Sequence, residues 1–201
     1  MRTQPQPARE PAALHAHAMD NLRYIRRTME RAGSFTALSG WGFVAAGVTG
    51  LVAAPLAALQ PTKELWLTTW LAAALLSLLI TGGATLRKAR LAGEHLLAGP
   101  GRKLLLSFSP PAVAALLLTP VLFGAGLTHL LPPLWLLLYG AGVVTGGTFS
   151  VRIVPVMGVS CMVIGATALL VPAAWGDVLM AIGFGAVHVA AGVLIARRHG
   201  G

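Results

Sequence analysis

Residues 145–158, TGGTFSVRIVPVMG, place one arginine inside a strongly apolar part of the chain. From residue 104 to residue 196, only Arg152 and Asp177 carry a formal charge. The apolar run around Arg152, residues 134–173, is far longer than the roughly 20 residues that a helix needs to cross a membrane. Because Arg152 and Pro155 stand where a turn would divide this run, the stretch predicts two membrane-spanning helices rather than one.

The composition of the whole chain also indicates a membrane protein. Of its 201 residues, 56% are hydrophobic and 10% are charged, and the mean hydropathy is +0.75. A soluble domain carries about 25% charged residues, so this chain is expected to be dissolved mostly in lipid. The single cysteine, Cys161, excludes an internal disulfide and a cysteine-based zinc site. No cleavable signal peptide is expected, because the first apolar segment is too long and follows a polar tail.

Charged residues, prolines and glycines divide the apolar sequence into six candidate spans. The sequence therefore predicts an all-α polytopic membrane protein. Residues 34–201 are expected to form a compact bundle of six transmembrane helices, preceded by a cytoplasmic amphipathic helix. The predicted spans are residues 36–59, 65–86, 104–127, 134–150, 153–173 and 178–196.

The orientation is predicted from lysine and arginine, which favour the cytoplasmic side of a membrane. With a cytoplasmic N-terminus, fourteen of the fifteen basic residues fall on the inside and only Lys63 falls outside. Both termini are then expected in the cytoplasm. This topology accounts for the net charge of +9, so no nucleic-acid partner is expected. The interfacial tryptophans Trp66, Trp135 and Trp175 fall at the outer ends of spans, in agreement with this orientation.

The N-terminal residues precede the first span and divide into two parts. Residues 1–11, with three prolines, are predicted to be a disordered tail. Residues 12–33 show a narrow apolar stripe at helical spacing, with arginines on the other faces. Three interpretations of this helix stay open: it lies on the inner leaflet, it pairs with a second copy of itself, or it packs on the protein's own loops. The stripe consists of Leu14, Ala18, Leu22, Ile25, Met29 and Ala32.

The acidic residues argue against ion-coupled transport. All six fall outside the predicted spans, whereas ion pumps usually place carboxylates inside the bilayer. The sequence shows no serine–histidine–acid set and no zinc-protease motif. His15 and His17 are two residues apart and would point to different faces of a helix. No enzyme activity, cofactor or metal site is therefore predicted.

His188 and Arg152 are the two polar positions that are candidates for a functional or structural role. His188 falls at mid-membrane depth. Its favoured interpretation is a neutral histidine that bonds a backbone carbonyl or a hydroxyl such as that of Ser160 or Thr145, and the alternative is a ligand or proton role. Arg152 is interpreted first as an anchor that reaches the headgroups or caps the preceding helix. An anion contact, with Thr145 and nearby hydroxyls, is its alternative.

Small residues indicate where helices approach each other closely. Spacings of four recur among them, as is common on the packing faces of membrane helices. Pro110 and Pro111 are expected to bend the third span, because proline removes an amide donor. The predicted packing positions are Gly42, Ala46, Gly50, Gly142, Gly146, Gly185 and Gly192.

Three segments carry a resemblance to a known family: RYIRRTMERAGSF at residues 23–35, GPGRKLLLSFSPP at 99–111 and LLLYGAGVVTGGTFSVRIVPVMG at 136–158. Together they resemble an uncharacterised family of small six-helix bacterial inner-membrane proteins. The resemblance implies a bacterial cytoplasmic membrane location and conditional expression, since members often accompany a winged-helix regulator. It implies no activity and no site residues. The chain is more loosely similar to acid-resistance membrane proteins of the HdeD type.

Two functions are consistent with these features. The first is a non-enzymatic accessory or stress-related membrane component that acts through helix packing and through contacts with lipids, with a second copy of itself or with another membrane protein. The second is a small-solute channel or uncoupled transporter, with a path near the third, fourth and sixth spans. A dry core favours the first function, and a polar cavity that reaches mid-membrane favours the second.

Overall fold

The computed structural model describes residues 19–25, 29, 35–93 and 99–199. Helices make up nearly all of this part of the chain, and an isolated bridge between Phe35 and Ser150 is its only β pairing. The predicted tail, residues 1–11, lies outside the described residues. Of the predicted amphipathic helix at 12–33, residues 19–25 and 29 are described, and they are helical.

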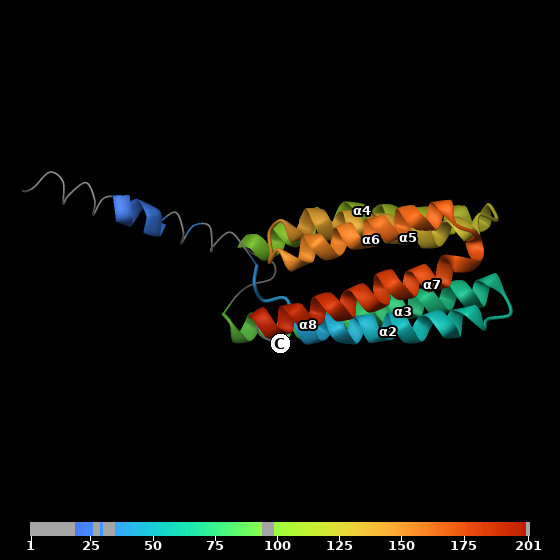
Figure 1. The fold of residues 1–201 in the computed structure, drawn as a ribbon, viewed down its shortest axis with the longest axis horizontal. Coiled ribbons are helices and arrows are strands. Elements are labelled where there is room, and N and C mark those ends of the chain that lie inside the picture. The colour runs from blue at the N-terminus through green and yellow to red at the C-terminus, as the bar shows by residue number, and fades with distance from the viewer. Residues whose placement is uncertain (1–18, 26–28, 30–34, 94–98, 200–201) are drawn as a thin grey trace, which may run out of the picture.

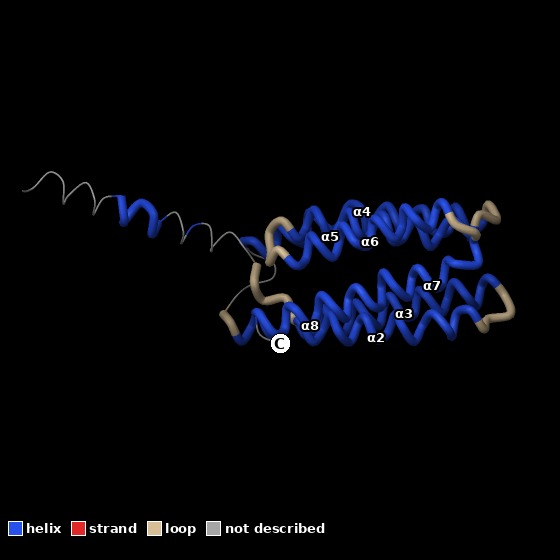
Figure 2. Tube along the Cα trace, in the orientation of Figure 1, coloured by secondary structure: helices blue, strands red, loops and turns tan. Residues whose placement is uncertain are grey.

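The helices are long rods joined at their two ends by short connections (Figure 2). Three short stretches interrupt the pattern: 3-10 turns precede α5 and α7, and a π-helical segment, η3, links α7 to α8. The main helices are α2 (Gly40–Ala58), α3 (Lys63–Leu91), α4 (Gly99–Gly124), α5 (Leu131–Gly147), α6 (Ile153–Leu170), α7 (Gly176–Met180) and α8 (Val187–His199). The short elements are η1 (Thr128–Leu130), η2 (Ala173–Trp175) and η3 (Ala181–Ala186).

Six of these rods are long and apolar enough to cross a membrane, which confirms the predicted fold class. They run over Gly40–Ala58, Lys63–Leu91, Gly99–Gly124, Thr128–Gly147, Ile153–Leu170 and Ala173–His199. The division at Arg152 is confirmed too, since α5 and α6 are separate helices on either side of it. Two helices run past the predicted span limits, α3 to Leu91 and α4 from Gly99. Arginine and lysine are good helix formers, so α3 and α4 extend beyond their apolar segments into sequence that contains charged residues.

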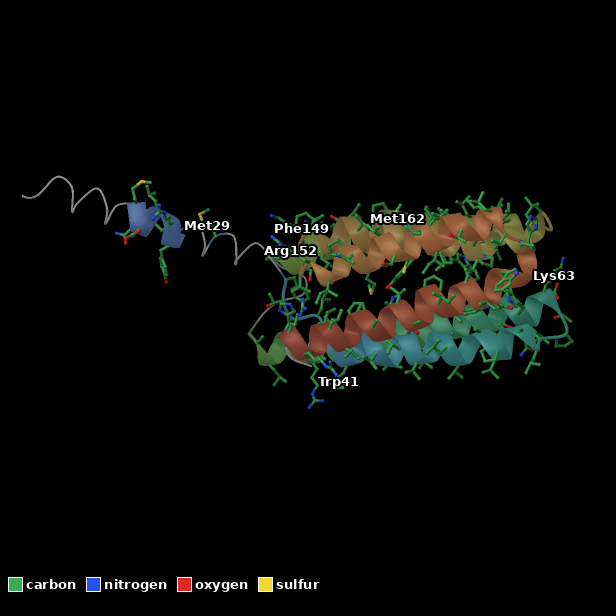
Figure 3. All side chains as sticks on the ribbon, in the orientation of Figure 1. Met29, Trp41, Lys63, Phe149, Arg152 and Met162 are labelled. Atoms are coloured by element: carbon green, nitrogen blue, oxygen red, sulfur yellow. The ribbon has the colours of Figure 1, made fainter. Side chains whose placement is uncertain are left out.

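The six rods are arranged as two groups of three (Figure 1). We call α2, α3 and the continuous α7–η3–α8 rod the first lobe, and α4, α5 and α6 the second lobe. The helix α2 packs on both α3 and α8, and α5 packs on both α4 and α6. The lobes meet where α5 and α6 contact the α7–η3–α8 rod. The bundle has an Arg152 end, which also holds Phe149, and an opposite Asp177 end, which also holds Lys63 (Figure 3).

Glycines bring the backbones together inside the first lobe. A Cβ atom at Gly192 would lie 2.6 Å from the Val44 amide nitrogen, and one at Gly47 would lie 2.7 Å from the Gly185 carbonyl oxygen. The predicted stripe of α2 is divided between two neighbours: Gly42 faces Ala84 and Thr81 of α3, whereas Gly50 faces η3. Residues eight apart on a helix are rotated by about 80°, so equal steps of four do not stay on one face.

The second lobe packs by the same means. Gly142 and Gly146 lie against Phe108 and Leu104 of α4, as close contacts of the predicted kind. The tightest approach involves glycines on two facing helices: a Cβ at Gly140 would lie 2.6 Å from the Gly158 carbonyl oxygen of α6. Both lobes are thus held by contact between backbones.

The prolines of α4 free backbone carbonyls without ending the helix, which continues to Gly124. Pro111 has no amide hydrogen to bond the carbonyl four residues earlier, that of Ser107. The Thr145 hydroxyl of α5 donates to this oxygen at 2.9 Å. Pro110 frees the Leu106 carbonyl in the same way, and the Ser109 hydroxyl donates to it at 3.1 Å. The carbonyls freed by Pro110 and Pro111 are therefore satisfied by side chains, as a helix in lipid requires.

The outward faces of α3 and α4 are apolar. Within α3 only Trp70, Thr85 and Ala89 are buried, and within α4 only Gly101 and Thr119. Leucines dominate the rest of these two surfaces, with Leu78 and Leu116 exposed by 66% and 70%. Such a surface is stable against lipid tails and unfavourable in water, so these faces identify a multi-pass membrane protein.

At the Arg152 end, residues 35–39 form a segment that we call the inner strap. The Phe35 amide donates to the Phe149 carbonyl, and the Ser150 hydroxyl donates to the Phe35 carbonyl at 2.7 Å. Lys88 of α3 donates to the Leu38 carbonyl at 3.1 Å. Phe35 is 2% exposed. The inner strap therefore links the first lobe to the connection between α5 and α6.

Candidate functional sites

The Tyr139–His188 pair lies in the interior, between the two lobes. Tyr139 comes from α5 and His188 from α8, and the distance between Oη and Nε2 is 2.6 Å. The other ring nitrogen, Nδ1, lies 2.9 Å from the Gly183 carbonyl oxygen. A carbonyl only accepts, so Nδ1 carries a hydrogen. In the neutral imidazole, the Nε2 lone pair then accepts from the tyrosine hydroxyl.

The π-helical segment explains how the Gly183 carbonyl reaches the histidine. Its wide turns place Gly183 and His188, five residues apart, on one face. The Cys161 thiol of α6 also points to this carbonyl, with Sγ 3.6 Å from the oxygen. The Gly183 carbonyl thus contacts side chains of both lobes, His188 of the first and Cys161 of the second.

Aromatic rings surround the Tyr139–His188 pair. Phe43 stacks on the imidazole with ring centres 6.1 Å apart, and Phe108 and Phe184 lie edge-on to the phenol ring at 5.9 and 5.3 Å. His188 is 4% exposed. Neither a 230 Å³ pocket at the Asp177 end nor a 510 Å³ apolar hollow on the outer face of α6 includes Tyr139 or His188 among its lining residues. His188 is therefore enclosed, and both of its ring nitrogens are occupied by hydrogen bonds.

The structure gives His188 the expected backbone carbonyl, but its hydroxyl partner is Tyr139. The two hydroxyls suggested by the sequence bond elsewhere: Ser160 donates to the Val156 carbonyl, and Thr145 donates to carbonyls of α4 and α5. The sequence did carry one signal for Tyr139. It is one of only two tyrosines in the chain, and it stands in the middle of a predicted span.

Arg152 is exposed at the start of α6, beside Phe149 (Figure 3). Among the described residues it makes no hydrogen bond and no ion pair. The hydroxyls proposed to help it hold an anion donate to backbone carbonyls: Thr148 to Thr145 and Ser150 to Phe35. Its role as an anchor stays a prediction.

The Asp177 end holds a second cluster, which the sequence did not predict. Oδ1 of Asp177 accepts from the indole nitrogens of Trp66 and Trp70, at 2.8 and 2.9 Å. Trp66 stacks on Trp135 of the second lobe, with ring centres 5.8 Å apart. The Trp135 indole donates to the Thr119 hydroxyl at 2.8 Å. We call these five residues the tryptophan cluster, and it joins α3 and α7 to α4 and α5.

The 230 Å³ pocket opens beside the tryptophan cluster, and we call it the end pocket. Lys63, Trp66 and Asp177 of the first lobe line it, together with Thr128, His129 and Pro132 of the second. Oγ1 of Thr128 is buried and has no hydrogen-bond partner among the described residues. The lining of the end pocket thus combines a cation, an anion and an unsatisfied hydroxyl.

A metal site at either place would need several ligands close together. In the described part of the chain, no group of three histidine, cysteine, aspartate or glutamate side chains is arranged to hold a metal ion. His15 and His17 lie outside the described residues. The two clusters are therefore considered for binding and for structure.

Comparison with known proteins found no matching family model, no matching curated protein and no matching solved structure. The function is therefore inferred from the geometry of the Tyr139–His188 pair and of the Asp177 end.

Proposed function

We propose that the protein is a non-enzymatic component of a bacterial inner membrane, which acts through contacts with lipids or other membrane proteins. The observation that carries this proposal is the closed interior. His188 uses both ring nitrogens in hydrogen bonds and is enclosed by aromatic rings. A water-filled path through the middle of the bundle would have to separate Tyr139 from His188, so this conformation favours a packed membrane component.

The exposed apolar residues near the N-terminus support a role in contacts. Leu22, Ile25 and Met29 are exposed by 60%, 51% and 70%. Apolar side chains on a cytoplasmic helix with nearby arginines suit the surface of an anionic membrane. We expect the Leu22→Asp and Ile25→Asp double variant to release this segment, measured by its protease sensitivity in vesicles. An unchanged cleavage rate would remove this support.

A flux measurement tests the proposal directly. The full chain, reconstituted in liposomes, is expected to give the same permeability to glycerol, urea and glycine as empty liposomes, measured by stopped-flow light scattering. A flux that depends on the protein would overturn the proposal. Lipids and proteins that co-purify with the full chain, identified by mass spectrometry, would then name its partners.

A small-solute transporter is the second candidate, and one observation favours it. Where α7 and η3 meet α5, the glycines Gly176 and Gly183 face side chains rather than backbone, and the end pocket lies between the lobes. Transporters commonly work by movement of one helix group against another. Protein-dependent flux that is lost when the lobes are crosslinked would support this candidate.

The proposed orientation places the Asp177 end outside the cell and the Arg152 end in the cytoplasm. It rests on the distribution of basic residues. Two exposed alanines allow a matched test in a Cys161→Ala background: Ala125→Cys at the Asp177 end and Ala92→Cys at the other. An impermeant thiol reagent added to intact cells is expected to label the first variant alone. The reverse pattern would invert the topology.

A further inference from the structure

The end pocket contains two opposite charges that do not neutralise each other. Lys63 and Asp177 both line it, yet they form no ion pair with each other. The Lys63 ammonium instead lies over the ring of Phe123, 5.6 Å from its centre. Opposite charges that line one pocket without pairing leave room for a group that satisfies both.

Asp177 is held in place with one oxygen free. Its Oδ1 accepts from the two indoles of the tryptophan cluster, which fixes the direction of the carboxylate. Its Oδ2 accepts no hydrogen bond from a described residue. A fixed carboxylate with a free oxygen is suited to an ammonium group, since charge-assisted hydrogen bonds are stronger than neutral ones.

The other side of the pocket offers donors. The Thr128 hydroxyl is buried without a partner among the described residues, and an unsatisfied buried polar group is unfavourable. His129 follows it in the chain and lines the same space as Lys63. An acidic group placed here would receive the threonine hydrogen bond and face the lysine ammonium.

We propose that the end pocket binds the ethanolamine phosphate group, with its ammonium on Asp177 and its phosphate on Lys63 and Thr128. The position of the pocket supports this chemistry. It lies beside Trp66 and Trp135 at the end of the spans, which is the depth that tryptophans share with lipid headgroups. The group has two sources, the headgroup of a phosphatidylethanolamine lipid and free phosphoethanolamine. The inference goes beyond the proposed function, because binding at this end requires no solute to cross.

The test is a thermal-unfolding measurement on the delipidated full chain in detergent. Phosphatidylethanolamine, phosphatidylglycerol and free phosphoethanolamine are added separately. We expect phosphatidylethanolamine to raise the unfolding temperature more than phosphatidylglycerol, which lacks the ammonium. A rise with free phosphoethanolamine as well identifies a soluble source, and a rise with the lipid alone identifies the headgroup. No rise with either ethanolamine compound, or equal rises with the two lipids, would overturn the inference.

Charge-neutral variants locate the binding. Asp177→Asn keeps an oxygen that can accept from both indoles but removes the negative charge, and Lys63→Gln removes the positive one. Each is expected to weaken the apparent affinity about tenfold, the effect of losing about 1.4 kcal/mol. Glu64→Gln is the matched control, because Glu64 is exposed next to Lys63 and does not line the pocket. Wild-type affinity in both Asp177→Asn and Lys63→Gln would overturn the assignment of the site.

Discussion

The contacts inside each lobe and the contacts between the lobes are built differently. Inside the lobes, glycines such as Gly192 and Gly158 bring one backbone against another. Between the lobes, a Cβ added at Gly176 or Gly183 would meet side chains, those of Pro132 and Leu136. Backbone contacts leave no room for adjustment, whereas side chains change rotamer. We therefore expect each lobe to be the more rigid unit and the face shared by the lobes to be the more adjustable part.

Polar side chains bond both inside the lobes and across the face between them. The Tyr139–His188 hydrogen bond crosses this face in its middle. At the Asp177 end the Trp66–Trp135 stack crosses it, whereas the hydrogen bonds of the tryptophan cluster lie within one lobe or the other. Hydrogen bonds fix direction, while close packing fixes distance.

The largest loss of stability is expected when a glycine inside a lobe is replaced by a residue with a large side chain. Gly192→Leu would force α8 away from the backbone of α2 at Val44, and we expect it to destabilise the protein by about 3 kcal/mol or more. Gly83→Leu is the matched control, since nothing lies within 4 Å of a Cβ there. Unfolding in detergent, followed by circular dichroism, measures both. Equal stability of the two variants would contradict the rigid-lobe description.

The second largest loss of stability is expected at the tryptophan cluster. Asp177→Leu leaves the indole hydrogens of Trp66 and Trp70 without an acceptor, at an expected cost of about 2 kcal/mol. Asp177→Asn retains an acceptor oxygen and is expected to lose less than half as much. The quenching of tryptophan fluorescence along the unfolding curve reports this region. If leucine is as stable as asparagine, the hydrogen bonds to the carboxylate do not stabilise the tryptophan cluster.

A smaller loss is expected at the Tyr139–His188 pair. Tyr139→Phe removes the hydroxyl and leaves Nε2 unpaired, at an expected cost of about 1 kcal/mol, in the range of hydrogen bonds within membrane proteins. A double-mutant cycle with His188→Phe isolates the coupling between the two side chains. A coupling indistinguishable from zero would mean that the rings around the pair, rather than its hydrogen bond, join the lobes in the middle.

Arg152 should give the smallest effect, because it is exposed and lies outside both kinds of interface. Arg152→Lys is expected to keep the stability of the wild type, and Arg152→Leu to lower it by about 0.5 kcal/mol through loss of the headgroup anchor. Unfolding in lipid nanodiscs compares the two variants. If leucine is no worse than lysine, the anchor interpretation is wrong.

The six spans could be predicted because hydropathy and charge are properties of local sequence. Arg152 with Pro155 was enough to divide the fourth span from the fifth. Local sequence does not indicate which helices lie side by side. Gly42 and Gly50 look alike in sequence but face different helices. The neighbour of a small residue depends on which faces fit each other, and this is a property of the assembled bundle.

The candidate sites were predicted less well for a related reason. The prediction for His188 included a carbonyl partner, but Tyr139 is 49 residues away and its hydroxyl reaches the ring only after the lobes assemble. Asp177 was assigned to a loop, although two features pointed to it. It is the only acid after Glu94, and Trp66 and Trp70 are four apart and share a helix face.

The π-helical segment sets the rotation of everything that follows it. Each residue of an α-helix turns the chain by about 100°, and a π turn accommodates one residue more than an α turn in the same length. If the same residues of η3 adopted α-helical winding instead, the additional residue would add its own rotation of about 100°. Residues 187–199 would then rotate by about 100° relative to the Asp177 end, which would carry His188 away from Tyr139 and Gly192 away from α2. The π winding of η3 is therefore as strict a requirement as the identity of its residues.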